Sequence, residues 1–253
     1  MRLVTVAHGT RHPTGNRVAA SLTAAAATRL GVRAQVSYVE LCEPLVGEVL
    51  GGSDPQGAEP TVLVPLLLTT GYHVRVDLPA AAERAPDDVV LTAPLGPDPL
   101  LAAAQVDRLL EAGAVPGQPV VLVAAGSRDP AASPELERAA ALLEATWGGP
   151  VRLATLSGAG ARLADVAQPG DAVSPYLLAE GFFAARCAES ARAAGAAVVA
   201  GALGEHPSLA EIVVERYQRA CTRATVLPPD GVGYRSAWPT AHMTMTGSPA
   251  TSP

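Results

Sequence analysis

The sequence contains no lysine: all 18 basic side chains are arginines, and 24 acidic ones give a net charge of −6. An acidic protein does not suit the phosphate backbone of nucleic acids, so we expect no nucleic-acid partner. Apolar runs of about 18 residues, the length of a membrane helix, are also missing. The first residues lack the basic and apolar regions of a signal peptide. The sequence therefore predicts a cytoplasmic protein without membrane contact.

Cysteines are few and scattered. Cys42, Cys187 and Cys221 lie far apart in the chain, and none belongs to a Cys-x-x-Cys pair. This pattern argues against a disulfide framework and against a structural zinc site, so we expect three reduced thiols. Hydrophobic residues make up 49% of the chain and charged residues 17%, which is typical of a globular protein.

The first half of the chain alternates apolar runs with alanine-rich and leucine-rich helical segments. The predicted strands cover 3–7, 34–41, 62–68 and 89–93, the predicted helices cover 16–30, 45–50 and 99–112, and 53–60 is a predicted loop. Such alternation is typical of a parallel sheet with helices on both faces. The fold class is therefore α/β.

The second half of the chain repeats the first. Three segments match in the same order: Val6-Ala-His-Gly-Thr-Arg-His-Pro13 with Val123-Ala-Ala-Gly-Ser-Arg-Asp-Pro130, Pro65-Leu-Leu-Leu-Thr-Thr-Gly-Tyr-His73 with Pro175-Tyr-Leu-Leu-Ala-Glu-Gly-Phe-Phe183, and Leu95-Gly-Pro-Asp-Pro99 with Leu203-Gly-Glu-His-Pro207. The sequence thus predicts a tandem duplication of a four-stranded parallel-sheet domain. The expected lobes are 1–114 and 119–224, and the aperiodic segment 228–253 is predicted to be a flexible tail.

The two copies differ where chemistry is expected. The second copy has Ala125 in place of His8, Phe183 in place of His73, and Thr155 opposite Glu40. The three polar residues of the first copy follow predicted parallel strands, whose carboxyl ends share one edge of the sheet, so we expect them to converge. Two imidazoles and a carboxylate suit a divalent first-row metal, and they also accept protons near neutral pH. The first half is therefore predicted to carry the reactive residues, and the second half is predicted to have a structural role.

Other polar residues are weaker candidates. Arg75 occurs only in the first copy and adjoins His73, which favours substrate binding, whereas Arg11 occurs in both copies and fits either an ion pair or anion binding. We expect His12 to be a solvated loop residue and His206 to lie on the surface at the start of a helix.

With these residues in view, the sequence resembles the class II chelatases of the sirohydrochlorin chelatase (CbiX/SirB) family. The matching pieces are Ala7-His8-Gly9-Thr10-Arg11 with Asn16, Glu40-Leu41 with Pro44, Pro65 to His73 with Asp77 and Pro79, and Leu95-Gly96. Thr10 stands in place of the usual serine, and the second copy lacks both histidines. The resemblance covers the first half and, more weakly, the second half to about residue 220.

This resemblance implies ATP-independent insertion of a divalent metal into sirohydrochlorin, a tetrapyrrole with eight carboxylates, held in a cleft between two similar lobes. We expect His8 and His73 to bind the metal, with Glu40 as the third catalytic residue. The expected substrate-binding residues are Thr10, Arg11, Gly71, Tyr72 and Arg75. The metal is a substrate, so no permanently bound cofactor is expected. Two fused lobes build one cleft without a dimer, which predicts a monomer.

Other functions fit parts of the same pattern. A histidine before a glycine is also found in histidine phosphatases, but these need an arginine where this chain has Ala7. A non-catalytic tetrapyrrole or metal carrier would bind without turnover. Among chelatases, iron insertion for siroheme is favoured over cobalt insertion for cobalamin, because no histidine-rich segment typical of a cobalt or nickel store is present.

Overall fold

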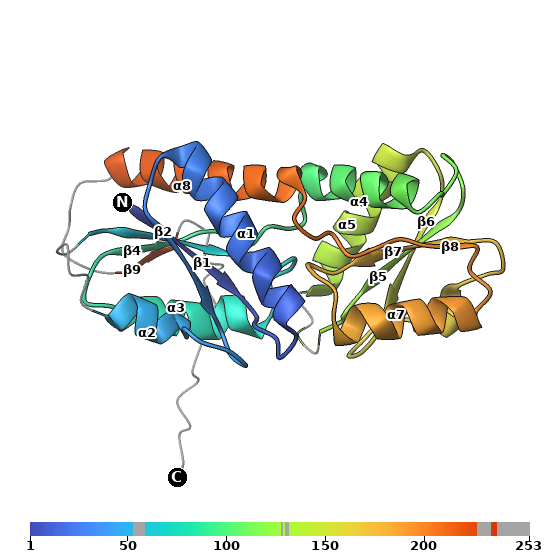
Figure 1. Cartoon of the computed structure of the whole chain (residues 1–253), viewed down its shortest axis with the longest axis horizontal. Coiled ribbons are helices and arrows are strands. Elements are labelled where there is room, and N and C mark those ends of the chain that lie inside the picture. The colour runs from blue at the N-terminus through green and yellow to red at the C-terminus, as the bar shows by residue number, and fades with distance from the viewer. Residues whose placement is uncertain (53–58, 128, 130–131, 227–233, 237–253) are drawn as a thin grey trace, which may run out of the picture.

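Two parallel sheets lie next to each other, and helices cover both faces of each sheet (Figure 1). The computed structural model describes residues 1–52, 59–127, 129, 132–226 and 234–236. The elements of the first half are β1 (Arg2–Ala7), α1 (Pro13–Leu30), β2 (Ala34–Tyr38), α2 (Val46–Gly51), β3 (Thr61–Pro65), the π-helical turn η1 (His73–Asp77), α3 (Leu78–Glu83), β4 (Val89–Leu91) and α4 (Pro99–Glu111). Those that follow are β5 (Val120–Ala124), α5 (Ala132–Trp147), β6 (Val151–Thr155), α6 (Leu163–Val166), β7 (Ala172–Tyr176), α7 (Phe182–Ala193), β8 (Val198–Val199), α8 (Pro207–Val226) and β9 (Tyr234–Ser236).

Both sheets have the same topology, which confirms the α/β fold and the structural duplication. The strand orders are β2-β1-β3-β4-β9 and β6-β5-β7-β8, and every pairing is parallel. The first strand of each copy lies between the second and third, so Ala7 pairs with Tyr38 in the first sheet just as Ala124 pairs with Thr155 in the second. The loops that leave these three strands therefore meet at one edge of each sheet.

Several predicted strands end earlier than expected. The strands predicted over 34–41, 62–68 and 89–93 end at Tyr38, Pro65 and Leu91. Their last apolar residues leave the sheet and belong to loops at its edge. The turn η1 and helix α3 were not predicted. Pro79 lies in the first turn of α3, a position where helices tolerate proline.

The predicted flexible tail is wrong at Tyr234–Ser236. These residues form β9, which pairs in parallel with β4 and extends the first sheet to five strands. The open edge of β4 offers unpaired backbone N–H and C=O groups, which a further strand satisfies. The other residues of the predicted tail, and residues 53–58 of the predicted loop, lie outside the described part of the chain.

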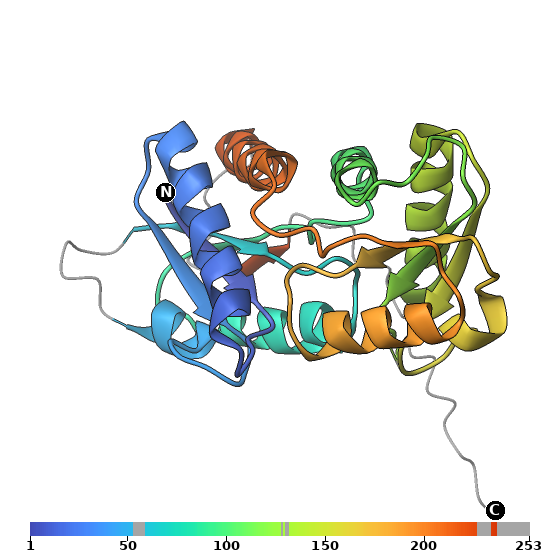
Figure 2. The same ribbon diagram turned by 45° about the vertical axis from the view of Figure 1, so that its right-hand side comes forward.

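The two lobes exchange their last helices. Helix α4 ends the first repeat but packs on α5 and β7 of the second, whereas α8 ends the second repeat and packs on α1 and β3 of the first. Figures 1 and 2 show α8 above the first sheet and α4 above the second. The predicted division near residues 115–118 therefore marks the repeat in the sequence, while each lobe in space contains a helix from the other half.

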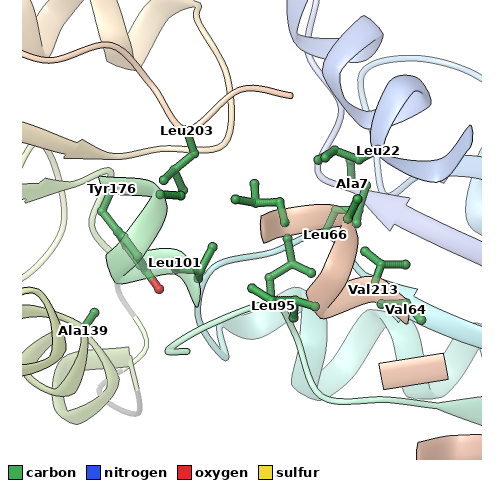
Figure 3. Close-up of a cluster of buried hydrophobic side chains, with 14 of the residues drawn as sticks. Ala7, Leu22, Val64, Leu66, Leu95, Leu101, Ala139, Tyr176, Leu203 and Val213 are labelled. Atoms are coloured by element: carbon green, nitrogen blue, oxygen red, sulfur yellow. The ribbon is translucent and has the colours of Figure 1, made fainter. Parts of the chain in front are cut away.

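One apolar core runs through both lobes as a result. Leu22 and Leu66 of the first half share a single cluster with Leu203 and Val213 of the second, and Leu101 of α4 joins them (Figure 3). Such a continuous core resists separation of the lobes, because pulling them apart would expose its apolar surface to water.

The buried side chain of Tyr176, in the second lobe, reaches the loop after β3 in the first. We call this boundary between the two lobes the seam. The Tyr176 hydroxyl donates to the Leu68 carbonyl oxygen at 3.1 Å, and burial, helped by the carboxylates of Glu135 and Asp98, raises the pKa of this phenol. Gly96 lies against this contact, and a Cβ there would overlap both the Tyr176 hydroxyl and the Leu68 carbonyl.

The cysteines and the lengths of the helices were also the subject of predictions from the sequence. All three cysteines are free thiols, and burial raises the pKa of Cys187 to about 12, so this thiol stays protonated. None of the helices in the described residues is long and apolar enough to cross a membrane.

Replacement of Gly96 tests the importance of this seam. We expect Gly96→Ala to lower the free energy of unfolding by about 1–3 kcal/mol, because the added methyl must displace Tyr176 or the backbone at Leu68. Urea denaturation measures this change. Gly47→Ala in α2 is the control, since its Cβ would meet nothing within 4 Å, and it should leave stability unchanged or higher. Equal stability of the two variants would contradict the prediction.

Candidate metal and substrate site

The candidate site begins at the carboxyl end of β1. His8 follows this strand directly, and Gly9 then turns the chain with φ +92°. A Cβ on Gly9 would overlap the carbonyl oxygen of Glu40, so this close approach of the two loops requires glycine. The Glu40 N–H donates to the His8 carbonyl oxygen at 3.1 Å. The backbone thereby holds the loops after β1 and β2 together.

His8, Glu40 and His73 converge as the sequence predicted. One ligand atom from each lies within 4.8 Å of the others. The two imidazole rings are 4.9 Å apart between centroids and nearly perpendicular, and His8 Nε2 lies 3.5 Å from Glu40 Oε1. About half of the His8 and Glu40 side chains is exposed, and His73 is half-buried. A small adjustment of these side chains brings them to the spacing around one ion, since metal–nitrogen bonds measure about 2 Å.

Each histidine uses its Nδ1 atom to contact a neighbouring oxygen. His8 Nδ1 lies 3.3 Å from the Gly9 carbonyl oxygen, and His73 Nδ1 lies 2.6 Å from Asp77 Oδ2. When Nδ1–H donates to these oxygens, the lone pair of Nε2 is free to bind a metal. We therefore assign Nε2 of both rings as the candidate ligand atoms.

Asp77 is the functional candidate that sequence reasoning did not single out. It was noted only as part of the resembling motif, without a role. Its position four residues after His73 places both side chains on the same face of a helical turn, which is the signal that could have identified it. A carboxylate on the far nitrogen of a ligating imidazole orients the ring and increases its basicity.

The loop between β1 and α1 is held by Asn16. The Thr10 N–H donates to the Asn16 side-chain oxygen at 3.2 Å, and the Asn16 amide donates to the Thr10 carbonyl oxygen at 2.8 Å. The Thr10 hydroxyl accepts from the His12 N–H, so this predicted substrate-binding residue supports the turn. Arg11 is exposed beside it and forms no ion pair with the described residues. Arg11 is thus available to a substrate anion, whereas Thr10 has a structural partner.

The loop before η1 faces the second lobe. A Cβ on Gly71 would lie 3.9 Å from Ser127 Oγ, and the Arg75 guanidinium contacts both oxygens of Asp129 at 3.1 and 3.2 Å. The Thr70 N–H and hydroxyl donate to Glu135 at 2.5 and 2.6 Å. The predicted substrate residue Arg75 therefore joins the lobes, and a substrate carboxylate would compete with Asp129 for it.

The second lobe keeps this scaffold without the ligands. Gly126 turns the chain with φ +91°, and a Cβ there would overlap the Ser157 carbonyl, as at Gly9 and Glu40. The strand register therefore aligns Glu40 with Ser157, which corrects the sequence alignment to Thr155 by two residues. Ala125, Ser157 and Phe183 then occupy the three ligand positions, and this set cannot chelate a metal.

Among the described residues, two further histidines lie outside this cluster. His12 is exposed and hydrogen-bonds the Thr14 hydroxyl at 2.9 Å, as expected of a loop residue. His206 contacts Asp107 at 3.1 Å and accepts from the Ser208 N–H at the start of α8. His12 therefore has its partner close by in sequence, and His206 is held by residues of α4 and α8.

A protein-family model matches both halves of the chain. The family model CbiX matches residues 2–112 and again residues 119–220. The chain belongs to the CbiX family. Its two matched stretches correspond to the two halves of the repeat.

Curated relatives of this CbiX-family protein are chelatases of two metals. The chain is 28% identical over 137 residues to a sirohydrochlorin cobaltochelatase of Methanopyrus kandleri, covering 44% of this chain and 95% of that protein. It is 32% identical over 147 residues to a sirohydrochlorin ferrochelatase of Priestia megaterium, covering 55% of each. The aligned region spans about half the length of the ferrochelatase.

Solved structures share the fold. SirB from Bacillus subtilis with Fe³⁺ superposes with a TM-score of 0.76 at 24% identity, covering 88% of this chain and 96% of that one. The sirohydrochlorin chelatase SirB from Bacillus subtilis subspecies spizizenii, in complex with cobalt, gives a TM-score of 0.74 at 22% identity and the same coverage. At this identity, these structures establish the two-lobed chelatase-like fold.

Replacement of Asp77 tests the orientation of His73. We expect Asp77→Asn to weaken Co²⁺ binding by about 10- to 100-fold, because the amide still accepts a hydrogen bond but no longer increases the basicity of the imidazole. Co²⁺ titration followed by visible absorption measures the affinity. Asp107→Asn makes the same change at the contact of His206 with Asp107, away from the site, and should leave Co²⁺ affinity unchanged. An unchanged affinity in Asp77→Asn as well would show that His73 needs no such partner.

Proposed function

We propose that this protein inserts a divalent metal, with Fe²⁺ preferred, into sirohydrochlorin without ATP. The observation that carries the proposal is the convergence of His8, Glu40 and His73 at the edge of the first sheet. The CbiX family assignment and the sirohydrochlorin chelatases among the relatives support the substrate. The expected monomeric state and cytoplasmic location stay predictions.

The proposed reaction exchanges two pyrrole N–H protons for one metal ion. A site for this exchange must hold the metal weakly enough to release it to the tetrapyrrole. Two imidazoles and one carboxylate, about half exposed, leave coordination positions open for the pyrrole nitrogens. His8 and His73 therefore bind the incoming ion in this proposal, and the ring approaches the open side.

Glu40 is the proposed proton acceptor. Its carboxylate lies beside His8 and is half exposed, so a proton taken from a pyrrole nitrogen can pass on to water. The two protons leave as the two metal–nitrogen bonds of the pyrrole anions form, and charge and atoms balance without a nucleotide or a redox partner.

The length of the chain is similar to that of a ferrochelatase relative, which supports the proposed preference for iron. The 147 residues aligned with the Priestia megaterium ferrochelatase cover 55% of each chain, so the two chains are of similar length. The Methanopyrus kandleri cobaltochelatase is nearly covered by 44% of this chain, and it therefore corresponds to a single lobe. Because the ligand set suits both ions, insertion of Co²⁺ is the second candidate function.

Substitution of the three residues tests the proposal. We expect His8→Ala and His73→Ala to reduce metal insertion by at least about 100-fold, because each removes a metal ligand, and Glu40→Gln to slow insertion while metal affinity changes less. Anaerobic assays with Fe²⁺ and with Co²⁺ follow the change in the pigment's absorption, after subtraction of spontaneous insertion.

His12→Ala is the matched control, because His12 lies in the same loop but its side chain hydrogen-bonds Thr14 instead of joining the cluster, and the variant should insert metal at the normal rate. A normal rate in His8→Ala would refute the assigned site. Stoichiometric binding of sirohydrochlorin without turnover by the unmodified protein would instead support the carrier interpretation.

A further inference from the structure

Phenylalanine is rare in this chain, and both phenylalanine side chains are exposed to solvent. The 253 residues contain two phenylalanines, Phe182 and Phe183, with exposed fractions of 71% and 39%. Their rings contact each other in a T-shaped arrangement, 5.4 Å apart between centroids. Large aromatic side chains normally fill cores, so adjacent exposed rings at the first turn of α7 point to a ligand that covers them.

These rings occupy the positions equivalent to the metal site of the first lobe. Val6 pairs with Pro65 in the first sheet as Val123 pairs with Pro175 in the second, so the two prolines are equivalent, and the chain aligns without a gap from each proline onward. Phe182 and Phe183 therefore correspond to Tyr72 and His73. The second copy has lost a ligand at this edge but has gained apolar surface there.

Exposed apolar side chains gather at the same edge of the first lobe. Leu41 follows Glu40 and is 49% exposed, and Tyr72 precedes His73 and is 61% exposed. The Tyr72 and His73 rings lie 6.3 Å apart between centroids. Apolar surface thus adjoins two of the three candidate metal ligands.

Leu41 has a backbone conformation that glycine adopts more easily. Its φ is +68°, and the equivalent residue of the second lobe, Gly158, has the same φ. A left-handed leucine costs roughly 1 kcal/mol relative to glycine. The first lobe therefore tolerates both strain and exposure to keep this apolar side chain beside Glu40.

The start of α7 faces the loop that carries His8. A Cβ on Gly15, near the start of α1, would lie 3.7 Å from the Glu180 carbonyl oxygen, two residues before Phe182. Figures 1 and 2 both show the beginning of α7 at the seam, next to the first lobe. The helix that starts with the two phenylalanines therefore begins next to the first lobe, close to the start of α1.

We propose that Phe182 and Phe183, together with Leu41 and Tyr72, form an apolar rim that seats the flat face of the tetrapyrrole over the metal site. This inference rests on the proposed function. A conjugated macrocycle is the kind of ligand that stacks on exposed aromatic rings. The degenerate lobe thereby contributes to substrate binding instead of chemistry.

The charges around the rim fit a macrocycle with peripheral carboxylates. Arg11 lies in the loop after His8, and Arg186 lies one turn after Phe182 on α7. Both are exposed and form no ion pair with the described residues. Guanidinium groups in these positions bind carboxylates at the edge of a ring whose face contacts the apolar side chains.

Binding of metal-free sirohydrochlorin tests the rim directly. We expect the double variant Phe182→Ala, Phe183→Ala to raise the Kd at least about tenfold, measured by fluorescence of the pigment, with Co²⁺ affinity at the histidines unchanged. Leu110→Ala is the control, because Leu110 is 46% exposed at the far end of α4, and its Kd should stay normal. An unchanged Kd in the double variant would overturn the rim.

Leu41→Gly separates a binding role from a structural one. We expect this variant to have an equal or higher Tm, because the left-handed strain is removed, and at the same time a weaker affinity for sirohydrochlorin. A normal affinity would remove Leu41 from the rim.

The unmodified protein distinguishes failure of the rim from failure of the proposed function. If it binds and metallates sirohydrochlorin while the phenylalanine variant binds equally well, only the rim fails. If it neither binds nor metallates sirohydrochlorin, the proposed function fails first. Sedimentation velocity tests whether a second molecule of this protein covers the rings instead. If the protein self-associates and the phenylalanine substitutions abolish this association, the rings belong to a protein–protein interface and the rim proposal is overturned.

Discussion

The candidate site depends on one close contact between two backbone segments. At Gly9 the chain passes the carbonyl of Glu40 with no room for a side chain, and this contact joins the loops after β1 and β2. Because β1 lies between β2 and β3, the same edge also receives the loop that carries His73. Ligands that are 32 and 33 residues apart in sequence, at positions 8, 40 and 73, thereby share one site on a rigid sheet.

The second lobe shows which parts of this arrangement are structural. It retains the strand order, the left-handed glycine and its contact with the next loop, and it has no metal ligand at the three equivalent positions. Packing therefore preserves the scaffold independently of chemistry. The two lobes differ at the edge itself. The first lobe carries two imidazoles and a carboxylate there, and the second lobe carries a pair of aromatic rings.

Exchange of the last helices links the two lobes physically. With α4 on the second sheet and α8 on the first, the chain crosses between the lobes twice, and the core is continuous. Polar contacts at the seam also fix how the two lobes are oriented relative to each other. They join Thr70 with Glu135, Arg75 with Asp129, and Tyr176 with Leu68. A ligand between the lobes therefore meets two edges whose relative position is set by the fold and not only by ligand contacts.

The sequence by itself determined the α/β class, the duplication and the convergence of His8, Glu40 and His73, because hydrophobic periodicity marks parallel strands and parallel strands end on one edge. It could not determine the helix exchange, because an apolar face marks a helix as packed without saying that α4 packs on α5 and β7, and α8 on α1 and β3. It also missed Asp77, η1–α3 and β9, and it aligned Glu40 two residues away from its true counterpart, Ser157. These features depend on which surfaces meet in space, on a side chain reaching its neighbour and on a free sheet edge, and only tertiary structure decides such contacts.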